Sequence, residues 1–239
     1  MLYLIGLGLD KKGISLKGLE AVKKCKVVYL ENYTVNFPYS VSQLSEVLGK
    51  KIILANREFI EGLEIVDSAK KKDVALLIYG SPLMATTHIT LVNEAKHSRV
   101  KCKIIQAGSV LDAVAETGLQ IYKFGKIASM PKWDLEKNFT PASFMGVVKV
   151  NESIEAHSLI LIDISLKFNK AIEQLTIAAK EKKIKIGRLI VCSNLGTKHS
   201  KIYYGKIEEL KTKKIFYPFC FILPSKLHFV EKESLERFR

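Results

Sequence analysis

Short apolar runs alternate with helix-type spacing along the first half of the chain. Continuous runs that stop at or beside glycine, as at residues 2–7 and 74–79, are typical of strands buried on both faces. Between the runs, Leu16, Leu19 and Val22 would share one helix face, with Ser15 as the N-cap. The pattern predicts strands at 2–7, 27–30, 52–55, 74–79 and 103–105, and helices at 14–24, 61–72, 87–98 and 110–117.

The rhythm changes near residue 118. The second half predicts strands at 126–130, 158–164, 188–193 and 215–223, helices at 141–156 and 169–182, and a strand end with a short helix within 203–211. Residues 131–140 form a predicted loop that holds Trp133. We therefore expect an α/β fold of two domains. Domain 1–115 would hold a mostly parallel sheet flanked by helices, and domain 116–239 a mixed sheet, with the ligand cleft between them.

Composition fits a soluble globular protein, because 48% of the 239 residues are apolar and 26% are charged. No apolar run reaches the roughly 20 residues that a membrane helix needs, and the first residues lack the features of a signal peptide. The cysteines lack Cys-x-x-Cys spacing, so we expect buried free thiols in a cytoplasmic protein rather than disulfides or zinc ligands. They are Cys25, Cys102, Cys192 and Cys220.

The net charge of +14 invites a nucleic-acid interpretation. However, the lysines are spread along the whole chain and are seldom interleaved with aromatic residues. This favours a solvated surface, as in heat-adapted proteins, over an RNA footprint. A basic RNA-binding protein remains the alternative from another functional class, and it predicts a contiguous Lys/Arg face.

Several predicted strands end in glycine-bearing or polar turns. In open α/β sheets, ligands bind beyond the carboxyl ends of the strands, where glycine lets the backbone approach closely. We therefore expect these turns, from both halves of the chain, to converge on one cleft. They lie at residues 6–9, 80–83, 107–110, 162–164 and 194–196.

Common catalytic and nucleotide motifs are weak or absent. Gly6-x-Gly8 with Glu31 suggests dinucleotide binding, but Lys11 stands where the third glycine belongs. Neither a P-loop nor a Gly-x-Ser-x-Gly elbow occurs, and the five histidines lack metal-ligand spacing, so no metal site is predicted. His88 would either face the cleft or serve a structural role at a helix start.

Two carboxylates, Asp112 and Glu116, would share one helix face and are the weak candidates for acid–base catalysis. The alternative, a solvated helix face, is the more common situation for carboxylates. A cleft lined by backbone groups and hydroxyls suits alkyl transfer from a sulfonium, because that reaction depends on in-line positioning. Positioning alone can supply on the order of 7–11 kcal/mol of such a barrier.

Five stretches of the chain resemble the diphthine synthase family, within the tetrapyrrole-methylase-like S-adenosylmethionine (SAM) methyltransferases. They are LYLIGLGL (2–9), SLKGLEA (15–21), GSPLMATTH (80–88), TGLQIYKFG (117–125) and PSKLHFVE (224–231). The resemblance implies a homodimer whose two α/β domains clasp SAM. It also implies N-methylation of a 3-amino-3-carboxypropyl chain on a modified histidine of translation elongation factor 2, which the archaeal type takes to the trimethylammonium form.

The resemblance assigns eight positions to the cofactor: Leu9, Ser81, Met84, Ser109, Val110, Ile162, Leu195 and Phe219. Two departures stand out, because the family usually carries Asp at the position of Ser81 and Gly at that of Ser225. Ser81 cannot offer a carboxylate to the SAM ammonium, so anchoring there should be weaker. A tetrapyrrole (corrinoid precursor) methyltransferase on the same fold is the alternative enzyme, and it predicts a large apolar trough at the domain junction.

Overall fold

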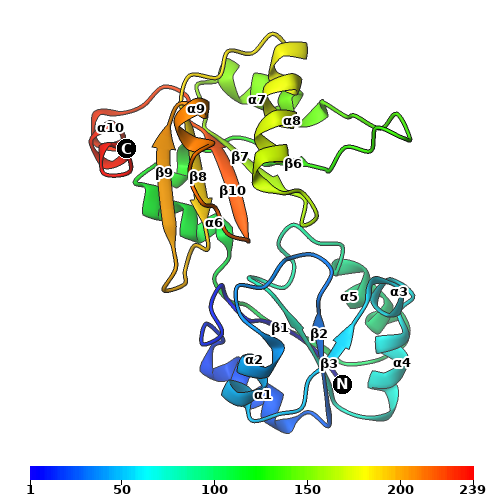
Figure 1. The fold of residues 1–239 in the computed structure, drawn as a ribbon. Coiled ribbons are helices and arrows are strands. Elements are labelled where there is room, and N and C mark those ends of the chain that lie inside the picture. The colour runs from blue at the N-terminus through cyan, green and yellow to red at the C-terminus, as the bar shows by residue number, and fades with distance from the viewer. The chain divides into compact units, whose positions relative to one another are not determined.

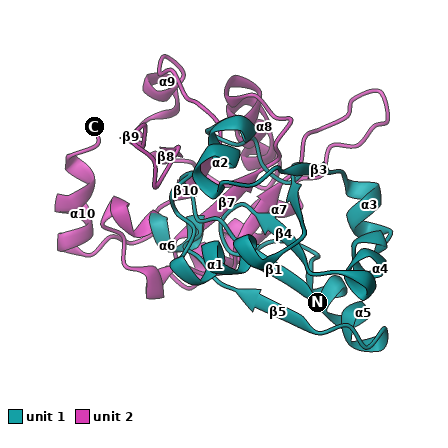
Figure 2. Cartoon of the chain, turned by 90° about the horizontal axis from the view of Figure 1, so that it is seen from below, with its two compact units in different colours: residues 1–113 teal, residues 114–239 magenta.

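The computed structural model describes residues 1–239, which divide into two compact units, Met1–Ala113 and Val114–Arg239 (Figure 2). Unit 1 has two clusters of buried apolar side chains, and unit 2 has one. The division expected after residue 115 and the one found here differ by two residues.

Unit 1 contains a five-stranded sheet in the order β3-β2-β4-β1-β5, and every neighbouring pair is parallel. All five residues of the central strand β4 are buried, which explains their unbroken apolar sequence. The strands are β1 (Leu2–Gly6), β2 (Val27–Glu31), β3 (Ile53–Ala55), β4 (Val74–Ile78) and β5 (Cys102–Ile105).

Helices cover both faces of this sheet (Figure 1). Helices α1 and α2 pack into one buried cluster, whereas α3, α4 and α5 pack into the other. Ser15 caps α1 as predicted, since its side chain accepts from the Gly18 N–H over 3.1 Å. The helices are α1 (Leu16–Lys24), α2 (Val41–Leu48), α3 (Arg57–Glu61), α4 (Glu64–Lys71), α5 (Ile89–His97) and α6 (Val110–Ala113).

Unit 2 contains a mixed sheet in the order β6-β7-β10-β8-β9. Only β6 and β7 are parallel; β10 runs antiparallel to both β7 and β8, and β9 antiparallel to β8. The strands are β6 (Ala128–Met130), β7 (Ser158–Ile162), β8 (Leu189–Ser193), β9 (Lys201–Gly205) and β10 (Phe219–Leu223).

The core of unit 2 lies between this sheet and helices α7 and α8. Phe221 of β10 and Leu175 of α8 are both completely buried in it. The helices are η1 (Val114–Thr117), η2 (Ile121–Lys123), α7 (Ser143–Ser153), α8 (Phe168–Glu181), α9 (Ile207–Leu210) and α10 (Phe229–Glu236), where η denotes a 3-10 helix.

Some predicted elements were wrong in extent. The helix expected at 61–72 begins only at Glu64, after Leu63, which adopts a left-handed conformation with φ of 66°. The last strand begins only at Phe219, after the cis peptide bond between Tyr217 and Pro218. The helix expected at 110–117 is divided into α6 and the 3-10 helix η1, which follows it directly.

Four helical segments were not predicted: α2, α3, α10 and the 3-10 turn η2. None exceeds eight residues, too few for a clear apolar period, so the informative signals were at their ends. Ser40 and Gln43 form a capping box at α2, and Gly49 ends that helix in a left-handed conformation.

The predicted fold class, α/β with a parallel N-terminal and a mixed C-terminal sheet, is confirmed. All four cysteines are free thiols; Cys25, Cys192 and Cys220 are buried as expected, whereas Cys102 is only partly buried. The longest helix, α8, has 14 residues, and none of the helices combines the length and apolar character that crossing a bilayer requires.

Candidate cofactor site

In unit 1, the turns after β1 and β4 are joined at the carboxyl edge of the sheet. Gly8 and Gly80 exchange two backbone hydrogen bonds, of 3.2 and 2.9 Å, and both have positive φ. A Cβ on Gly6 would lie 2.6 Å from the Gly80 carbonyl oxygen and 2.9 Å from Ala107 Cβ. The close approach of these three turns therefore requires glycine at position 6.

Leu9 and Ser81 are the residues that directly follow Gly8 and Gly80 in the chain. The Ser81 side chain is nearly buried, and its hydroxyl donates to Oε1 of Gln106 over 2.6 Å. Because the proton is used there, the Ser81 oxygen keeps lone pairs that can accept from a ligand. The Leu9 carbonyl accepts from the Tyr79 hydroxyl over 3.1 Å, and burial raises the pKa of Tyr79, which keeps it a donor.

Ser109 lies beside the same turns, since a Cβ on Gly80 would be 3.7 Å from the Ser109 Cα. Its amide and its hydroxyl both donate to Oδ2 of Asp112, over 2.7 and 3.0 Å, and the hydroxyl accepts from the Leu111 N–H. Ser109 and Asp112 thus cap the start of α6. The amide and hydroxyl of Ser109 are already hydrogen-bonded within the protein. Ser109 would therefore contact a ligand through van der Waals interactions.

The other two unit 1 positions flank these turns. Val110 is the first residue of α6. Met84 donates its amide to the Ser81 carbonyl over 3.2 Å, and its side chain is 42% exposed, so it is a mobile apolar group available for contact.

In unit 2, the three predicted positions share one edge of the sheet. Ile162 ends β7, Leu195 follows β8, and Phe219 begins β10, which is antiparallel to both. The Asn194 amide donates to the Pro218 carbonyl over 2.8 Å, which ties the turn after β8 to the start of β10.

Asn194 itself was not singled out in the sequence. It adopts φ of +52° and is nearly buried, and its Oδ1 has no hydrogen-bond partner. A buried unpaired acceptor is costly unless a ligand or water satisfies it. The one available signal was its place in Asn-Leu-Gly directly after an apolar strand.

The two edges fit SAM by their chemistry. The eight predicted residues include no charged side chain, which suits the adenosyl and thioether portions of the molecule. Glycine turns bring backbone groups to the unit 1 edge, Ser81 offers an acceptor for the ammonium, and Asn194 offers one for an amino or hydroxyl group. Each edge therefore offers groups of the kind that contact SAM, and the eight cofactor positions stay a prediction.

Asp112 and Glu116 do not form a catalytic pair within one unit. Asp112 belongs to unit 1 and caps α6, whereas Glu116 belongs to the 3-10 turn of unit 2, where the Ser200 hydroxyl lies 3.5 Å from its Oε2. A role for either as a general base stays a prediction.

His88 serves the turn after β4. It is almost completely buried, and its Nδ1 donates to the Pro82 carbonyl oxygen over 3.2 Å. Nε2 has no partner in the protein. The contact favours the structural role considered for His88 over direct binding.

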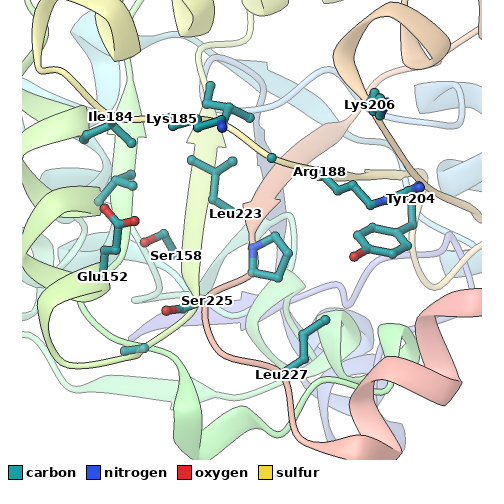
Figure 3. A pocket seen from close by; sticks show the side chains of 15 residues that line it. Glu152, Ser158, Ile184, Lys185, Arg188, Tyr204, Lys206, Leu223, Ser225 and Leu227 are labelled. Carbon is teal, nitrogen blue, oxygen red and sulfur yellow. The ribbon is translucent and has the colours of Figure 1, made fainter.

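Unit 2 also has a pocket of about 420 Å³ at the edge of its sheet opposite to the cofactor positions (Figure 3). Ser158 at the start of β7 and Leu223 at the end of β10 line it, which fixes this location. Ser225, one of the two departures from the family pattern, contributes a hydroxyl to the same pocket. The pocket is therefore separate from the predicted SAM positions of unit 2.

Comparisons with known proteins place the chain in a family. Residues 1–211 match the model of the Tetrapyrrole (Corrin/Porphyrin) Methylases. The diphthine synthase of Methanocaldococcus jannaschii is 37% identical over 99% of this chain and 98% of its own length. The protein named "Probable diphthine methyl ester synthase" of Arabidopsis thaliana is 36% identical, over 100% and 98%.

A third relative matches in part. The diphthine methyl ester synthase of Schizosaccharomyces pombe is 44% identical over 170 residues, and the match spans 70% of this chain but 59% of that protein. Among solved structures, a crystal structure of diphthine synthase superposes with a TM-score of 0.89, at 32% identity, over 99% of this chain and 95% of that one.

The glycine turns, the uncharged side chains at the eight predicted positions and the full-length similarities agree with one another. The chain belongs to the diphthine synthase family of the tetrapyrrole methylases, in which S-adenosyl-L-methionine is the methyl donor.

Proposed function

We propose that this chain transfers methyl groups from SAM to the amine of a 3-amino-3-carboxypropyl histidine on translation elongation factor 2, in diphthamide biosynthesis. The main support is the full-length similarity to diphthine synthases at 37% identity. The enzyme would act in the cytoplasm as a homodimer. The edges described above would hold SAM through Leu9, Ser81, Met84, Ser109 and Val110 of unit 1, and Ile162, Leu195 and Phe219 of unit 2.

The residues of this chain would act by binding and orientation. When bound, SAM supplies an electrophilic methyl group on its sulfonium. Ser81 would accept a hydrogen bond from its ammonium, and the buried Leu195 and Phe219 would exclude water from its thioether. Fixing donor and acceptor in line contributes more to this reaction than a strong base does.

The acceptor amine must lose a proton before it attacks. An unperturbed alkyl amine has a pKa of about 10, and an uncharged surround lowers that value because it disfavours the ammonium. The eight positions carry no carboxylate, although Asp112 accepts from Ser109 and Asp163 directly follows Ile162. We take water as the proton acceptor, with Asp112 and Glu116 as the alternative.

The experiment has two stages. Calorimetry would first measure SAM affinity, and labelled SAM would then be incubated with elongation factor 2 that carries the unmethylated side chain. We expect label on the modified histidine and none on a factor with that histidine replaced. Tight SAM binding without transfer to the factor would contradict the proposed substrate.

The number of methyl groups distinguishes two products. Relatives bear the names diphthine synthase and diphthine methyl ester synthase, so the first product is methylated at the amine alone and the second also at the carboxylate. We propose the first. Mass spectrometry of the modified peptide before and after mild alkali would decide, because only the ester is hydrolysed.

A tetrapyrrole methyltransferase is the second candidate, since the family model bears that description. The two differ in substrate size and class. A corrinoid precursor that accepts label faster than the elongation factor would favour this second candidate.

A further inference from the structure

A buried carboxylate holds α10 against the beginning of unit 2. Glu231 is fully buried and accepts four hydrogen bonds: from the Gln120 amide at 2.9 Å, the His228 amide at 2.7 Å, Lys123 Nζ at 2.6 Å and His157 Nε2 at 3.0 Å. We call these side chains, Glu231, Lys123 and His157, the α10 anchor. It fixes two segments, 120–123 and 228–231, that are far apart in the sequence.

Further contacts make this attachment rigid. Lys123 Nζ also donates to the Lys226 carbonyl over 2.8 Å, and the Ser225 amide donates to His157 Nδ1 over 3.0 Å. Gly118, with φ of 82°, lies so close to α10 that a Cβ there would collide with Ser234. These contacts on both sides of α10 hold its backbone in place.

Several apolar side chains beside the α10 anchor are exposed on the surface. Tyr122 is 81% exposed and Phe229 is 73% exposed, and Ile121 and Val230 are each nearly half exposed. Large apolar groups on an immobilised backbone are typical of binding surfaces, because little conformational entropy is lost when a partner covers them.

The pocket of Figure 3 adjoins these residues through the segment that leads into α10. Pro224, Ser225 and Leu227 line the pocket, and His228 and Phe229 follow directly. Its rim carries three cations, Lys185, Arg188 and Lys206, none of which forms an ion pair with a carboxylate of the chain. One carboxylate, Glu152, lies on the other side (Figure 3).

Part of this surface lies beyond the general family match. The tetrapyrrole methylase model ends at residue 211, whereas the diphthine synthase of M. jannaschii matches 99% of the chain. Helix α10 therefore lies in the part that this chain shares with diphthine synthases beyond the general methylase model. A protein substrate, unlike a macrocycle, needs an extended contact surface outside the reaction site.

We infer that Ile121, Tyr122, Phe229 and Val230, together with the pocket rim Lys185, Arg188 and Lys206, form the docking surface for the protein substrate. The segment that binds there would present apolar side chains to the aromatic residues and acidic side chains to the unpaired cations. This inference rests on the proposed function, since it assumes a protein substrate.

Charge argues against a second copy of this chain as the occupant. The pocket lining holds three cations against one carboxylate, Glu152, and Glu209 beside Lys206 accepts from the Lys206 amide rather than from its side chain. A symmetric contact would place these cations opposite one another, which is unfavourable. An acidic partner neutralises them instead.

The test separates docking from chemistry. The double substitution Tyr122→Ala and Phe229→Ala removes two exposed side chains, so the fold should be retained. We expect the KM for the elongation factor to rise at least about tenfold, with SAM affinity unchanged and kcat at saturating factor within about twofold. Ile177→Ala, on the exposed face of α8, is the matched control and should leave KM unchanged.

A second pair of variants tests the charges. Lys185→Gln with Lys206→Gln should raise KM and weaken its dependence on salt, whereas Lys180→Gln on α8 should do neither. An unchanged KM in the aromatic double variant of an active enzyme would overturn the docking surface alone. Conversion of a dimer into monomers by that variant would show an interface between copies, which also overturns it. Failure of the wild-type protein to methylate the factor would instead contradict the proposed function.

Discussion

His157 and Glu231, separated by 74 positions in the sequence, meet in the interior of unit 2 with 3.0 Å between Nε2 and Oε1. His157 accepts from the Ser225 amide at Nδ1, so its Nε2 carries the proton and the ring is neutral. The two side chains are completely buried. Lys123 supplies the positive charge that balances Glu231.

Acid should destabilise unit 2 in two stages. Burial lowers the pKa of His157 below 6.5, so the unfolded chain binds the extra proton first and stability declines as pH falls below about 6.5. Burial alone would raise the pKa of Glu231, but its hydrogen bonds, led by that from Lys123, lower it to about 2, so a further loss follows below about pH 4.5. Urea unfolding from about pH 8 to about pH 2.5 measures both stages; a midpoint independent of pH would contradict this assignment.

Removing the carboxylate of Glu231 should lower the free energy of unfolding far more than removing that of Glu233. Glu231→Ala leaves Lys123 and two backbone amides without their acceptor, and we expect a loss of about 3–5 kcal/mol in unfolding free energy, at the lower end because Lys123 reaches solvent. Glu233→Ala, on the exposed side of α10, should change it by about 0.5 kcal/mol or less. Chemical denaturation of the two variants compares them directly, and equal losses would contradict a role for the α10 anchor.

Adding a methyl group at Gly6 should disrupt the unit 1 edge. The new Cβ of Gly6→Ala would lie 2.6 Å from the Gly80 oxygen, so the turns must separate and SAM affinity should fall at least about tenfold. Gly146→Ala is the control, because a Cβ there meets nothing within 4 Å and helix α7 should gain up to about 1 kcal/mol. Calorimetry with SAM distinguishes the variants, and unimpaired binding by Gly6→Ala would exclude this edge as the site.

Ser81→Asp should strengthen cofactor binding. The carboxylate would add a charge-assisted contact to the SAM ammonium, and the side chain of Gln106 can turn its amide nitrogen toward it. We expect about tenfold tighter binding that weakens with salt, with Ser81→Ala as the uncharged comparison. An affinity no better than that of wild type would mean that the ammonium lies elsewhere.

Loss of both candidate carboxylates should leave the chemistry intact. In Asp112→Asn with Glu116→Gln we expect an unchanged pH dependence of kcat, because neither group is needed as a base. Asp112→Ala should cost about 1 kcal/mol of stability through loss of the α6 cap. A pH profile that shifts in the double variant would restore these residues as catalytic candidates.

Long periodic elements were predictable from the sequence, and local breaks were not. The buried strand β4 and the capped helix α1 follow from apolar period and a serine cap. The break at Leu63 was missed because a left-handed non-glycine residue leaves no pattern signal.

The candidate site was predictable in part for the same reason. Turns after strands revealed Gly80 and Ser81, whereas Asn194 needed the structure, since its significance lies in burial without a partner. The attachment of Glu231 to His157 could not be inferred either, because it is a contact between distant segments that no local spacing encodes.

The α10 anchor also constrains the order in which the protein can mature during translation. Lys123 and His157 leave the ribosome well before Glu231, and until it arrives their nitrogen atoms have only water as a partner. Unit 2 therefore completes its interior only after residue 231 has been added. Nascent chains that stall earlier would expose this region to chaperones and proteases, whereas unit 1 is free to fold as soon as β5 has emerged.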